Sequence, residues 1–208
     1  METIIVIPAR HGSSRFPGKP LASVMGVSLL QRVWRIAKGV PGVSEVVVAT
    51  DDERIRTHVE SFGGRVVMTS EGCRNGSERV CEALATLGGD PRIVINLQGD
   101  AVLMPPWVIG GLVEAMRLDS SIQIATPATR LSKEQYQRMV TMKQSGIVSG
   151  TTVTFGRDGN ALYFSKGIIP FVRALPQDGE PPIFQHIGVY AYRPESLRRY
   201  ISLPVGMF

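Results

Sequence analysis

The sequence predicts an α/β protein with a Rossmann-like, mostly parallel sheet that carries helices on both faces and has an antiparallel excursion. Short β-branched runs recur along the chain, and helix-length segments with apolar residues at helical spacing separate the early runs. Such alternation of strands and helices favours a parallel sheet that is covered on both sides. The stretch from residue 143 to 160 is richer in Gly, Ser and Thr, and an Asp-Gly-Asn turn at 158–160 predicts the antiparallel part.

The individual elements follow from local signals. Strands are expected at residues 4–7, 46–49, 65–68, 93–97, 122–126, 152–155 and 188–192. Apolar residues at helical spacing predict helices near 29–37 and 80–87, and a further helix is expected to run through Ile55 and Val59. We expect Ser28 to cap the first of these helices and Gly39 to end it, Asp51 or Asp52 to open the second, and Ser77 to cap the third.

Length and composition limit the possible classes of protein. With 208 residues, 43% of them hydrophobic, the chain suits one substantial core, so a single domain over residues 1–208 is expected. No apolar run approaches the roughly 20 residues that span a bilayer. The N-terminus also enters the first predicted strand without a basic leader, so we expect a cytoplasmic protein with no membrane partner.

Charge and cysteine content point to a small anionic substrate and to ordinary thiols. The formal net charge is +5, but the basic residues are scattered and no aromatic-interleaved basic stripe accompanies them. We therefore expect no nucleic-acid partner, and a small polyanion explains the charge equally well. Cys73 and Cys81 lack metal-ligand spacing and are expected to be reduced thiols.

The first predicted strand leads directly into a loop, residues 8–21, that combines small residues, hydroxyls and three cations. Backbone N–H groups of such a loop can approach phosphate oxygens, while Arg10 and Arg15 can fork onto them and Lys19 supplies a compact charge. The loop is not a P-loop, because Pro20 follows Lys19 where Ser or Thr would be needed. The pattern favours a triphosphate, and a solvated polar loop is the alternative.

A carboxylate follows the hydrophobic strand expected at 93–97. The sequence there is Gln98-Gly99-Asp100, and parallel strands present their carboxyl ends at one edge of the sheet. Asp100 is thus well sited to hold Mg²⁺ against a triphosphate. The alternative is that Asp100 only caps the next turn or helix.

These motifs together resemble those of a known family. The blocks at 8–10, 13–15 and 17–19 are similar to the N-terminal signature of sugar-activating nucleotidyltransferases, and Gln98-Gly99-Asp100 followed by Leu103 resembles the metal-binding block of 3-deoxy-manno-octulosonate (Kdo) cytidylyltransferases. The resemblance implies the nucleotide-diphospho-sugar transferase type of fold, with CTP as the nucleotide. It implies catalytic roles for Arg10, Lys19 and Asp100, with Asp100 a ligand of Mg²⁺. The nucleotide-binding residues that it implies are Pro8, Ala9, Arg10, Ser13, Arg15, Lys19, Asn75, Gly76, Ser77 and Gln98.

The resemblance extends to a segment that binds the acceptor. It implies that Gln98, Lys166, Arg173, His186 and Tyr190 contact the sugar acid. The even spacing of His186 and Tyr190 predicts that they lie on one face of a single strand. The implied reaction is transfer of CMP from CTP to the anomeric hydroxyl of Kdo or a closely related 2-keto-3-deoxy sugar acid, with release of pyrophosphate, for lipopolysaccharide or surface polysaccharide synthesis. Analogy with the family also implies a homodimer, formed in part by residues 150–163.

Three departures keep alternatives open. Ala101-Val102 stands where the family usually has Glu-Pro, and Lys166 stands where it generally has Arg. Family members also continue for a few dozen residues, through a block with a further Asp ligand, and the chain is expected to lack this C-terminal segment. The alternatives are a CMP transferase for another acidic sugar (a nonulosonate or amino-Kdo), a catalytically weak CTP-binding homologue, or an enzyme that uses another acid, such as Asp51 or Asp52, as a ligand.

Overall fold

The computed structural model describes residues 2–12 and 16–204. The chain divides into two compact units. The larger comprises Met1–Ala125 and Val189–Phe208, and the smaller comprises Thr126–Gly188. Whether they act as the single domain expected over residues 1–208 stays a prediction. No helix in the described ranges is long and apolar enough to cross a membrane.

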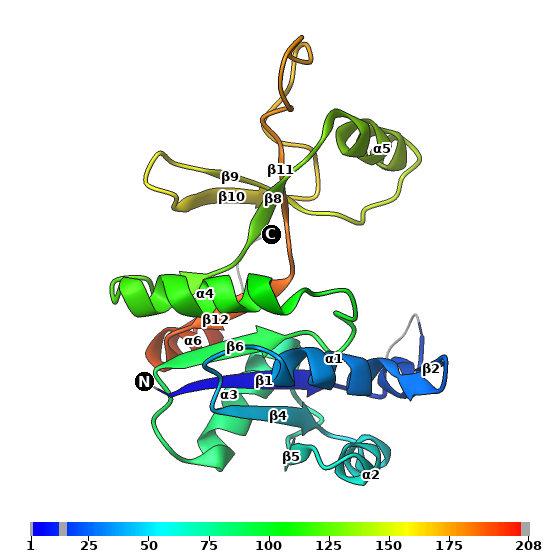
Figure 1. Ribbon diagram of the computed structural model, residues 1–208, viewed down its shortest axis with the longest axis vertical. Helices are drawn as coiled ribbons and strands as arrows, with labels where there is room; N and C mark the ends of the chain where they lie inside the picture. Colours follow the sequence, from blue (N-terminus) through cyan, green and yellow to red (C-terminus); the bar gives the residue numbers. More distant parts are fainter. Residues whose placement is uncertain (1, 13–15, 205–208) are drawn as a thin grey trace. The chain divides into compact units, whose positions relative to one another are not determined.

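The larger unit is built on a sheet in the order β5-β4-β1-β6-β12-β7 (Figure 1). Its strands are β1 (Thr3–Ala9), β4 (Glu45–Thr50), β5 (Arg65–Met68), β6 (Ile93–Leu97), β7 (Ile124–Ala125) and β12 (Val189–Tyr192). The pairs β5/β4, β4/β1 and β1/β6 are parallel, and β12 runs antiparallel to both β6 and β7. This confirms the mostly parallel sheet that the β-branched runs predict.

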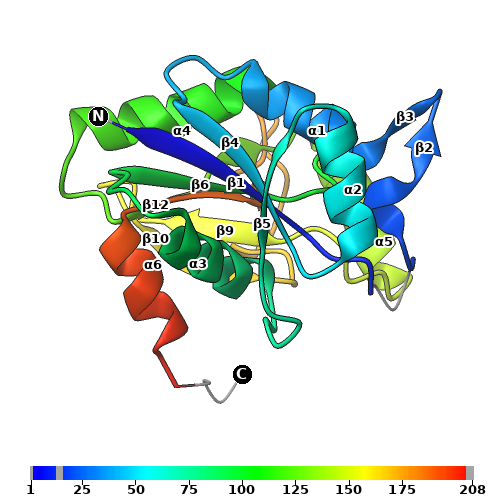
Figure 2. The same cartoon turned by 90° about the horizontal axis from the view of Figure 1, so that it is seen from below.

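The central strands of this sheet present apolar side chains on both faces, and helices cover each face. In Figure 2, α3 (Gly76–Leu87) and α6 (Pro194–Ile201) lie on one face, while α1 (Leu29–Lys38) and α4 (Pro106–Leu118) lie on the other. The helix α2 (Glu53–Ser61) contacts β4 and the edge strand β5. A short 3₁₀ helix, η1 (Lys19–Leu21), precedes the hairpin of β2 (Ser23–Val24) and β3 (Val27–Ser28). Apolar side chains of β1, β4, β6, α3 and α6 form one continuous core cluster.

The predicted helix caps are confirmed at two helices and wrong at the third. The Ser28 hydroxyl accepts from the Gln31 N–H at 3.1 Å, and the Asp52 carboxylate accepts from the Arg54 N–H at 2.9 Å. Asn75, not Ser77, caps α3, because its Oδ1 accepts from the Glu78 N–H at 3.0 Å. Ser77 lies inside the first turn, where its hydroxyl is free to bond elsewhere.

The smaller unit contains an antiparallel sheet in the order β10-β9-β11-β8, which confirms the excursion. Its elements are β8 (Ala128–Arg130), α5 (Lys133–Gln144), β9 (Thr152–Phe155), β10 (Ala161–Ser165) and β11 (Phe184–His186). The expected turn joins β9 to β10, with Gly159 at a φ of 80° that favours glycine. A capping box between Ser132 and Gln135 starts α5. Leu131, Met139 and Ile183 form the local core.

The prediction that His186 and Tyr190 share one strand is wrong. The strand β11 ends at His186, and β12 begins at Val189. The two strands belong to different sheets, since β11 pairs with β8 and β9 while β12 pairs with β6 and β7. The Ile187 N–H still donates to the Pro127 carbonyl, in register with the β11/β8 pairing, and the chain then crosses to β12. His186 therefore belongs to the smaller unit and Tyr190 to the larger.

Candidate active site

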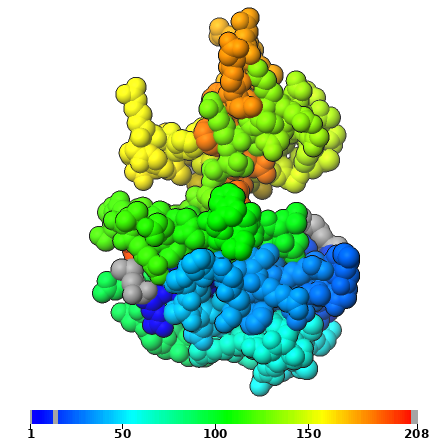
Figure 3. Space-filling view, in the orientation of Figure 1, coloured from blue at the N-terminus to red at the C-terminus, as the bar shows by residue number. Residues whose placement is uncertain are grey.

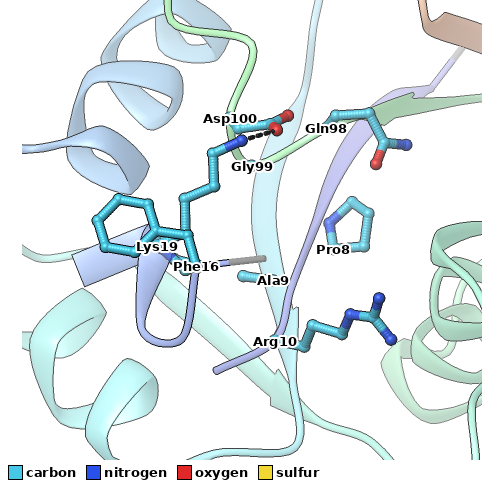
Figure 4. A pocket seen from close by; sticks show the side chains of 9 residues that line it. Pro8, Ala9, Arg10, Phe16, Lys19, Gln98, Gly99 and Asp100 are labelled. Atoms are coloured by element: carbon cyan, nitrogen blue, oxygen red, sulfur yellow. Dashed lines mark hydrogen bonds and ion pairs between the residues drawn. The ribbon is translucent and has the colours of Figure 1, made fainter. Parts of the chain in front are cut away.

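A crevice opens where β1 and β6 end, next to each other in the parallel part of the sheet. The strand β1 pairs with β4 on one side and β6 on the other, so the strand order reverses at this point. In open α/β sheets, ligands bind outside the carboxyl ends of strands at such a reversal. The cavity there has a volume of about 530 Å³ (Figure 4). Its lining is Pro8, Ala9, Arg10, Phe16, Lys19, Pro20, Gln98, Gly99 and Asp100.

A cation and an anion meet at this cavity. The Lys19 ammonium lies 2.5 Å from Oδ2 of Asp100, and the two side chains are 40% and 51% exposed. Lys19 opens η1 directly after Gly18, whose φ of 71° favours glycine. Asp100 does not cap the following helix, because α4 has Pro105 at its N-cap. Asp100 lines the cavity instead, and its role as a metal ligand stays a prediction. In Figure 4, the ion pair lies on one side of β1, and Gln98 and Arg10 lie on the other.

A second cavity of about 270 Å³ adjoins the first and shares four of its residues. Both are lined by Pro8, Ala9, Arg10 and Gln98, and the second adds Cys73, Arg74, Asn75, Gly76 and Arg79. The start of α3 can lie this close to β1 because residue 76 is a glycine. A Cβ at Gly76 would lie 3.2 Å from Pro8 Cγ and 3.4 Å from Gln98 Nε2. The two cavities together are lined by most of the described residues that the sequence predicts for nucleotide binding.

Side chains of α3 hold the segment that walls the second cavity. Arg79 is 3% exposed, and its guanidinium donates to Asp51 Oδ2 and to Thr69 Oγ1, each at 2.6 Å. Glu82 accepts from the Ser70 N–H at 2.6 Å and from the Cys73 thiol at 3.0 Å. Burial, followed by the bond to Glu82, raises the pKa of the Cys73 thiol to about 11, so this cysteine stays protonated and unreactive.

The comparisons with known proteins agree with this geometry. The family model "Cytidylyltransferase" matches residues 4–205. A 3-deoxy-manno-octulosonate cytidylyltransferase from Maricaulis maris is 54% identical over 98% of this chain and 78% of its own length. The chain belongs to the cytidylyltransferase family.

Two further relatives narrow the comparison within the cytidylyltransferases. An 8-amino-3,8-dideoxy-manno-octulosonate cytidylyltransferase from Shewanella pealeana is 41% identical over 99% of this chain and 80% of its own length. The solved structure of a CMP:2-keto-3-deoxy-manno-octonic acid synthetase complexed with CTP matches with a TM-score of 0.86 and 36% identity, over 100% of this chain and 80% of that one. The resemblance to Kdo cytidylyltransferases is therefore confirmed.

Cytidylyltransferases that use CTP generally use a divalent metal, and the crevice has one residue suited to it. Magnesium is commonly held by one or two carboxylates together with substrate phosphates, and Asp100 offers one such carboxylate at the cavity. No cluster of three or more His, Cys, Asp or Glu that could hold a metal occurs in the described part of the chain. The residues thus fit a cation shared with a bound triphosphate and do not form a closed protein cage.

Asp51 and Asp52, the alternative acidic ligands, are both engaged elsewhere. Asp51 pairs with the buried Arg79 guanidinium. Asp52 caps α2, and the hydrogen bond from the Arg54 side chain lowers the pKa of Asp52 to about 2. Neither lines the cavity beside Asp100. That one of them serves as a metal ligand stays a prediction.

The predicted acceptor residues are distributed over both units. In the smaller unit, the Lys166 ammonium donates to Thr151 Oγ1 at 2.9 Å, and His186 Nε2 lies 2.8 Å from Thr126 Oγ1. Burial, with a smaller contribution from the Lys166 charge, lowers the pKa of His186 below 6.5, so its imidazole is neutral at pH 7. Arg173 is exposed in the same unit, whereas Tyr190 and Gln98 belong to the larger unit. Their contacts with a sugar acid stay predictions.

Two predicted residues lie outside the described ranges, and two residues near the site were missed by the sequence analysis. Ser13 and Arg15 fall in the gap between residues 12 and 16. Arg79 walls the second cavity, and Asn96 hydrogen-bonds to Gln98. Arg79 carries no local signal on an otherwise ordinary helix. Asn96 does carry one, as an amide inside the aliphatic run Ile-Val-Ile-Asn-Leu.

Proposed function

We propose that this protein transfers CMP from CTP to the anomeric hydroxyl of Kdo or a closely related 2-keto-3-deoxy sugar acid and releases pyrophosphate. One observation carries the proposal. In a chain 54% identical to a Kdo cytidylyltransferase, Arg10, Lys19, Gln98 and Asp100 line one crevice at the carboxyl ends of β1 and β6. The product would serve lipopolysaccharide or surface polysaccharide synthesis. Because CTP is an intracellular nucleotide, we place the reaction in the cytoplasm.

The side chains at the crevice would act by charge and position. Arg10 and Lys19 supply cations for the triphosphate, while the adjoining cavity between the end of β1 and the start of α3 receives the nucleoside. The sugar hydroxyl attacks the α-phosphorus in line, a new P–O bond forms, and the bond to the β-phosphate oxygen breaks as pyrophosphate leaves. Little covalent work falls to the protein in such a transfer, so alignment and charge neutralisation supply most of the acceleration.

Asp100 is the residue that would hold Mg²⁺. Bound there, the ion would polarise phosphate oxygens and offset the charge that develops on the leaving pyrophosphate. Without nucleotide, the Lys19 ammonium neutralises the Asp100 carboxylate at 2.5 Å. Phosphate oxygens are negatively charged, as the Asp100 carboxylate is, so they would compete with it for the Lys19 ammonium. Binding of the triphosphate would therefore release this carboxylate as Lys19 turns toward the phosphates.

The test measures pyrophosphate release from CTP, Mg²⁺ and Kdo. Wild type is expected to turn over, and Asp100→Asn is expected to fall to background, because the amide keeps the shape but loses the negative charge. Asp90→Asn is the matched control, since Asp90 is exposed and lies outside both cavities, and it should keep full activity. Near-normal release by Asp100→Asn would refute the assignment of the metal ligand.

An amino-substituted Kdo is the second candidate acceptor. Lys166 and Ala101 depart from the Kdo pattern, and 8-amino-3,8-dideoxy-manno-octulosonate cytidylyltransferases are 41% identical to this chain. A panel of Kdo, 8-amino-Kdo and a nonulosonate, each with CTP, separates the candidates by their kcat/KM. CTP binding by calorimetry without turnover on any acceptor would instead support a catalytically weak CTP-binding homologue.

We also propose a homodimer that uses the β9–β10 hairpin. Leu162 and Tyr163 are 70% and 64% exposed, and Phe155 and Phe164 are exposed beside them on the same hairpin. Figure 3 shows this hairpin, in yellow, projecting from the smaller unit. Large exposed apolar groups gathered on one element mark an association surface. Sedimentation velocity should give a dimer that Leu162→Glu converts to a monomer, and a wild-type monomer at micromolar concentration would refute the proposal.

A further inference from the structure

The strand β6 contains one buried polar residue, Asn96, at a position where an aliphatic residue is expected. Asn96 is 1% exposed, and the other four residues of β6 are Ile, Val, Ile and Leu. Its neighbours across the sheet are Val6 on β1 and Tyr190 on β12. Asn is disfavoured in strands, and burying an amide is costly unless its groups are hydrogen-bonded. A polar residue at a buried position of the strand that leads into the site therefore indicates a functional role.

Asn96 is the middle of a chain of hydrogen bonds that runs from the core to the cavity. Its Oδ1 accepts from Gln98 Nε2 at 3.0 Å, and its Nδ2 donates to Ser77 Oγ at 3.3 Å. The Ser77 hydroxyl lies 3.4 Å from the Tyr192 hydroxyl. Burial raises the pKa of Tyr192 to about 12, so the core end of the chain is a neutral hydroxyl at physiological pH.

The cavity end of this chain is Gln98, which lines both parts of the candidate site. Gln98 and Asn96 are two residues apart along the strand direction, so their side chains lie on one face. Because Nε2 of Gln98 donates to Asn96 Oδ1, the orientation of the carboxamide is fixed, and its Oε1 remains as an acceptor. Figure 4 shows this oxygen facing Pro8, where the two cavities join.

We propose that Asn96 is a positioning residue that fixes the rotamer and the orientation of the Gln98 carboxamide, with Ser77 and Tyr192 as its anchors. A glutamine side chain has three rotatable bonds and two chemically opposite ends, so an unheld Gln98 would present donor and acceptor in turn. Held by Asn96, it offers the bound substrates one acceptor at one place. The expected effect of Asn96 on kcat/KM rests on the proposed function, whereas the fixed orientation of the Gln98 side chain does not.

The network also explains why Ser77 is not the cap of α3. Asn75 already satisfies the N–H of Glu78, which leaves the Ser77 hydroxyl for Asn96 and Tyr192. The helix start is thus joined to the centre of the sheet through a polar contact. Movement of either element would be transmitted to Gln98.

The experiment uses Asn96→Leu, which keeps the approximate shape of the side chain and removes both hydrogen bonds. Gln98 is partly exposed and can bond to water instead, and Ser77 keeps Tyr192, so few buried groups are left without a partner. We expect a folded protein whose kcat/KM is lower by about tenfold to a hundredfold. Ile95→Val is the matched control, because Ile95 is fully buried on the opposite face of the same strand, and it should keep its kcat/KM.

A double-mutant cycle separates positioning from a general structural effect. If Asn96 acts through Gln98, then Asn96→Leu added to Gln98→Ala causes no further loss in kcat/KM. Fully multiplicative losses would overturn the inference. Should Asn96→Leu fail to fold, Ser77→Ala and Tyr192→Phe interrupt the same chain farther from Gln98. They should give successively smaller losses that also vanish in the Gln98→Ala background, and losses that persist there would overturn it.

A readout without turnover keeps the inference testable even if the proposed function fails. The side-chain NH₂ pair of Gln98, identified by its disappearance in Gln98→Ala, can be followed by ¹⁵N NMR. In wild type it should be shifted and rigid, and in Asn96→Leu it should move to the position of solvent-exposed glutamines. An unchanged Gln98 pair in Asn96→Leu would refute the positioning role, whatever the enzyme acts on.

Discussion

Replacing Arg79 by methionine should destabilise the larger unit by about 3 kcal/mol. The Arg79 side chain is 4% exposed, and its guanidinium bonds to Asp51, Thr69 and the Ser70 carbonyl. Methionine fills the space but leaves the Asp51 carboxylate, itself only 16% exposed, without its partner. Breaking a buried pair costs about 3–5 kcal/mol, and the partial exposure of Asp51 places this one at the low end.

Thermal and urea unfolding, followed by circular dichroism, measure the effect. A loss of about 3 kcal/mol corresponds to a fall in Tm of about 6–12 °C for a chain of this size. Arg74→Met is the contrasting control, because Arg74 pairs with Glu78 while 65% exposed, and it should cost far less than Arg79→Met. Removing both charges with Arg79→Met and Asp51→Leu should recover most of the loss. A single Arg79→Met as stable as Arg74→Met would refute the reasoning.

Two predictions concern titration. Asp52→Ala should destabilise α2 by about 1 kcal/mol, because it removes the helix cap. The side-chain bond from Arg54 lowers the pKa of Asp52 from 3.8 to about 2, so the difference in stability from wild type, measured by urea unfolding, should be complete above pH 3.8 and shrink as the pH falls toward 2. A difference already gone at pH 5 would contradict this. Lys166→Met should raise the pKa of His186, because it removes a nearby positive charge, but the pKa should stay below 6.5 because burial is the larger cause of the shift. A ¹H NMR titration of the imidazole measures this pKa in both proteins. A midpoint that is the same in both would exclude an effect of the Lys166 charge on His186.

The parts of the fold and site that depend on local signals could be predicted from the sequence. Continuous aliphatic runs fix the buried strands β1, β4 and β6, and their carboxyl ends place Arg10 and Asp100 at one crevice. Family resemblance adds the nucleotide and acceptor. The helices α4, α5 and α6 and the strands β8 and β11 were not predicted, because short or weakly patterned segments form only when tertiary partners complete them.

The wrong predictions share a physical cause, which is competition from partners distant in the sequence. Ser77 has the right residue type for a cap, but Asn75 occupies that position and Ser77 bonds to Asn96 and Tyr192, which lie 19 and 115 residues away. The even spacing of His186 and Tyr190 would place them on one face only if the strand continued. It does not continue, because β11 ends at His186 and the chain crosses to another sheet before β12 begins at Val189.

The sequence could have predicted that Asn96 is part of a buried polar network, but not which residues are its partners. An amide inside a run of four aliphatic residues must find hydrogen bonds or destabilise the strand, so the residue type of Asn96 is enough to indicate a polar network. The identity of that network depends on how α3 and β12 pack against β6, which no local pattern encodes. Arg79 differs, because an arginine on a helix is ordinarily solvated and gives no such signal.

The helix α3 thus makes two polar attachments beside the site, through Ser77 and Arg79. Ser77 is linked to Gln98 through Asn96 in the sheet, while Arg79, which lines the second cavity, donates to Asp51 and Thr69. A rigid α3 with these two polar attachments can keep the second cavity in register with the first, whereas apolar packing alone would leave the orientation of Gln98 unspecified.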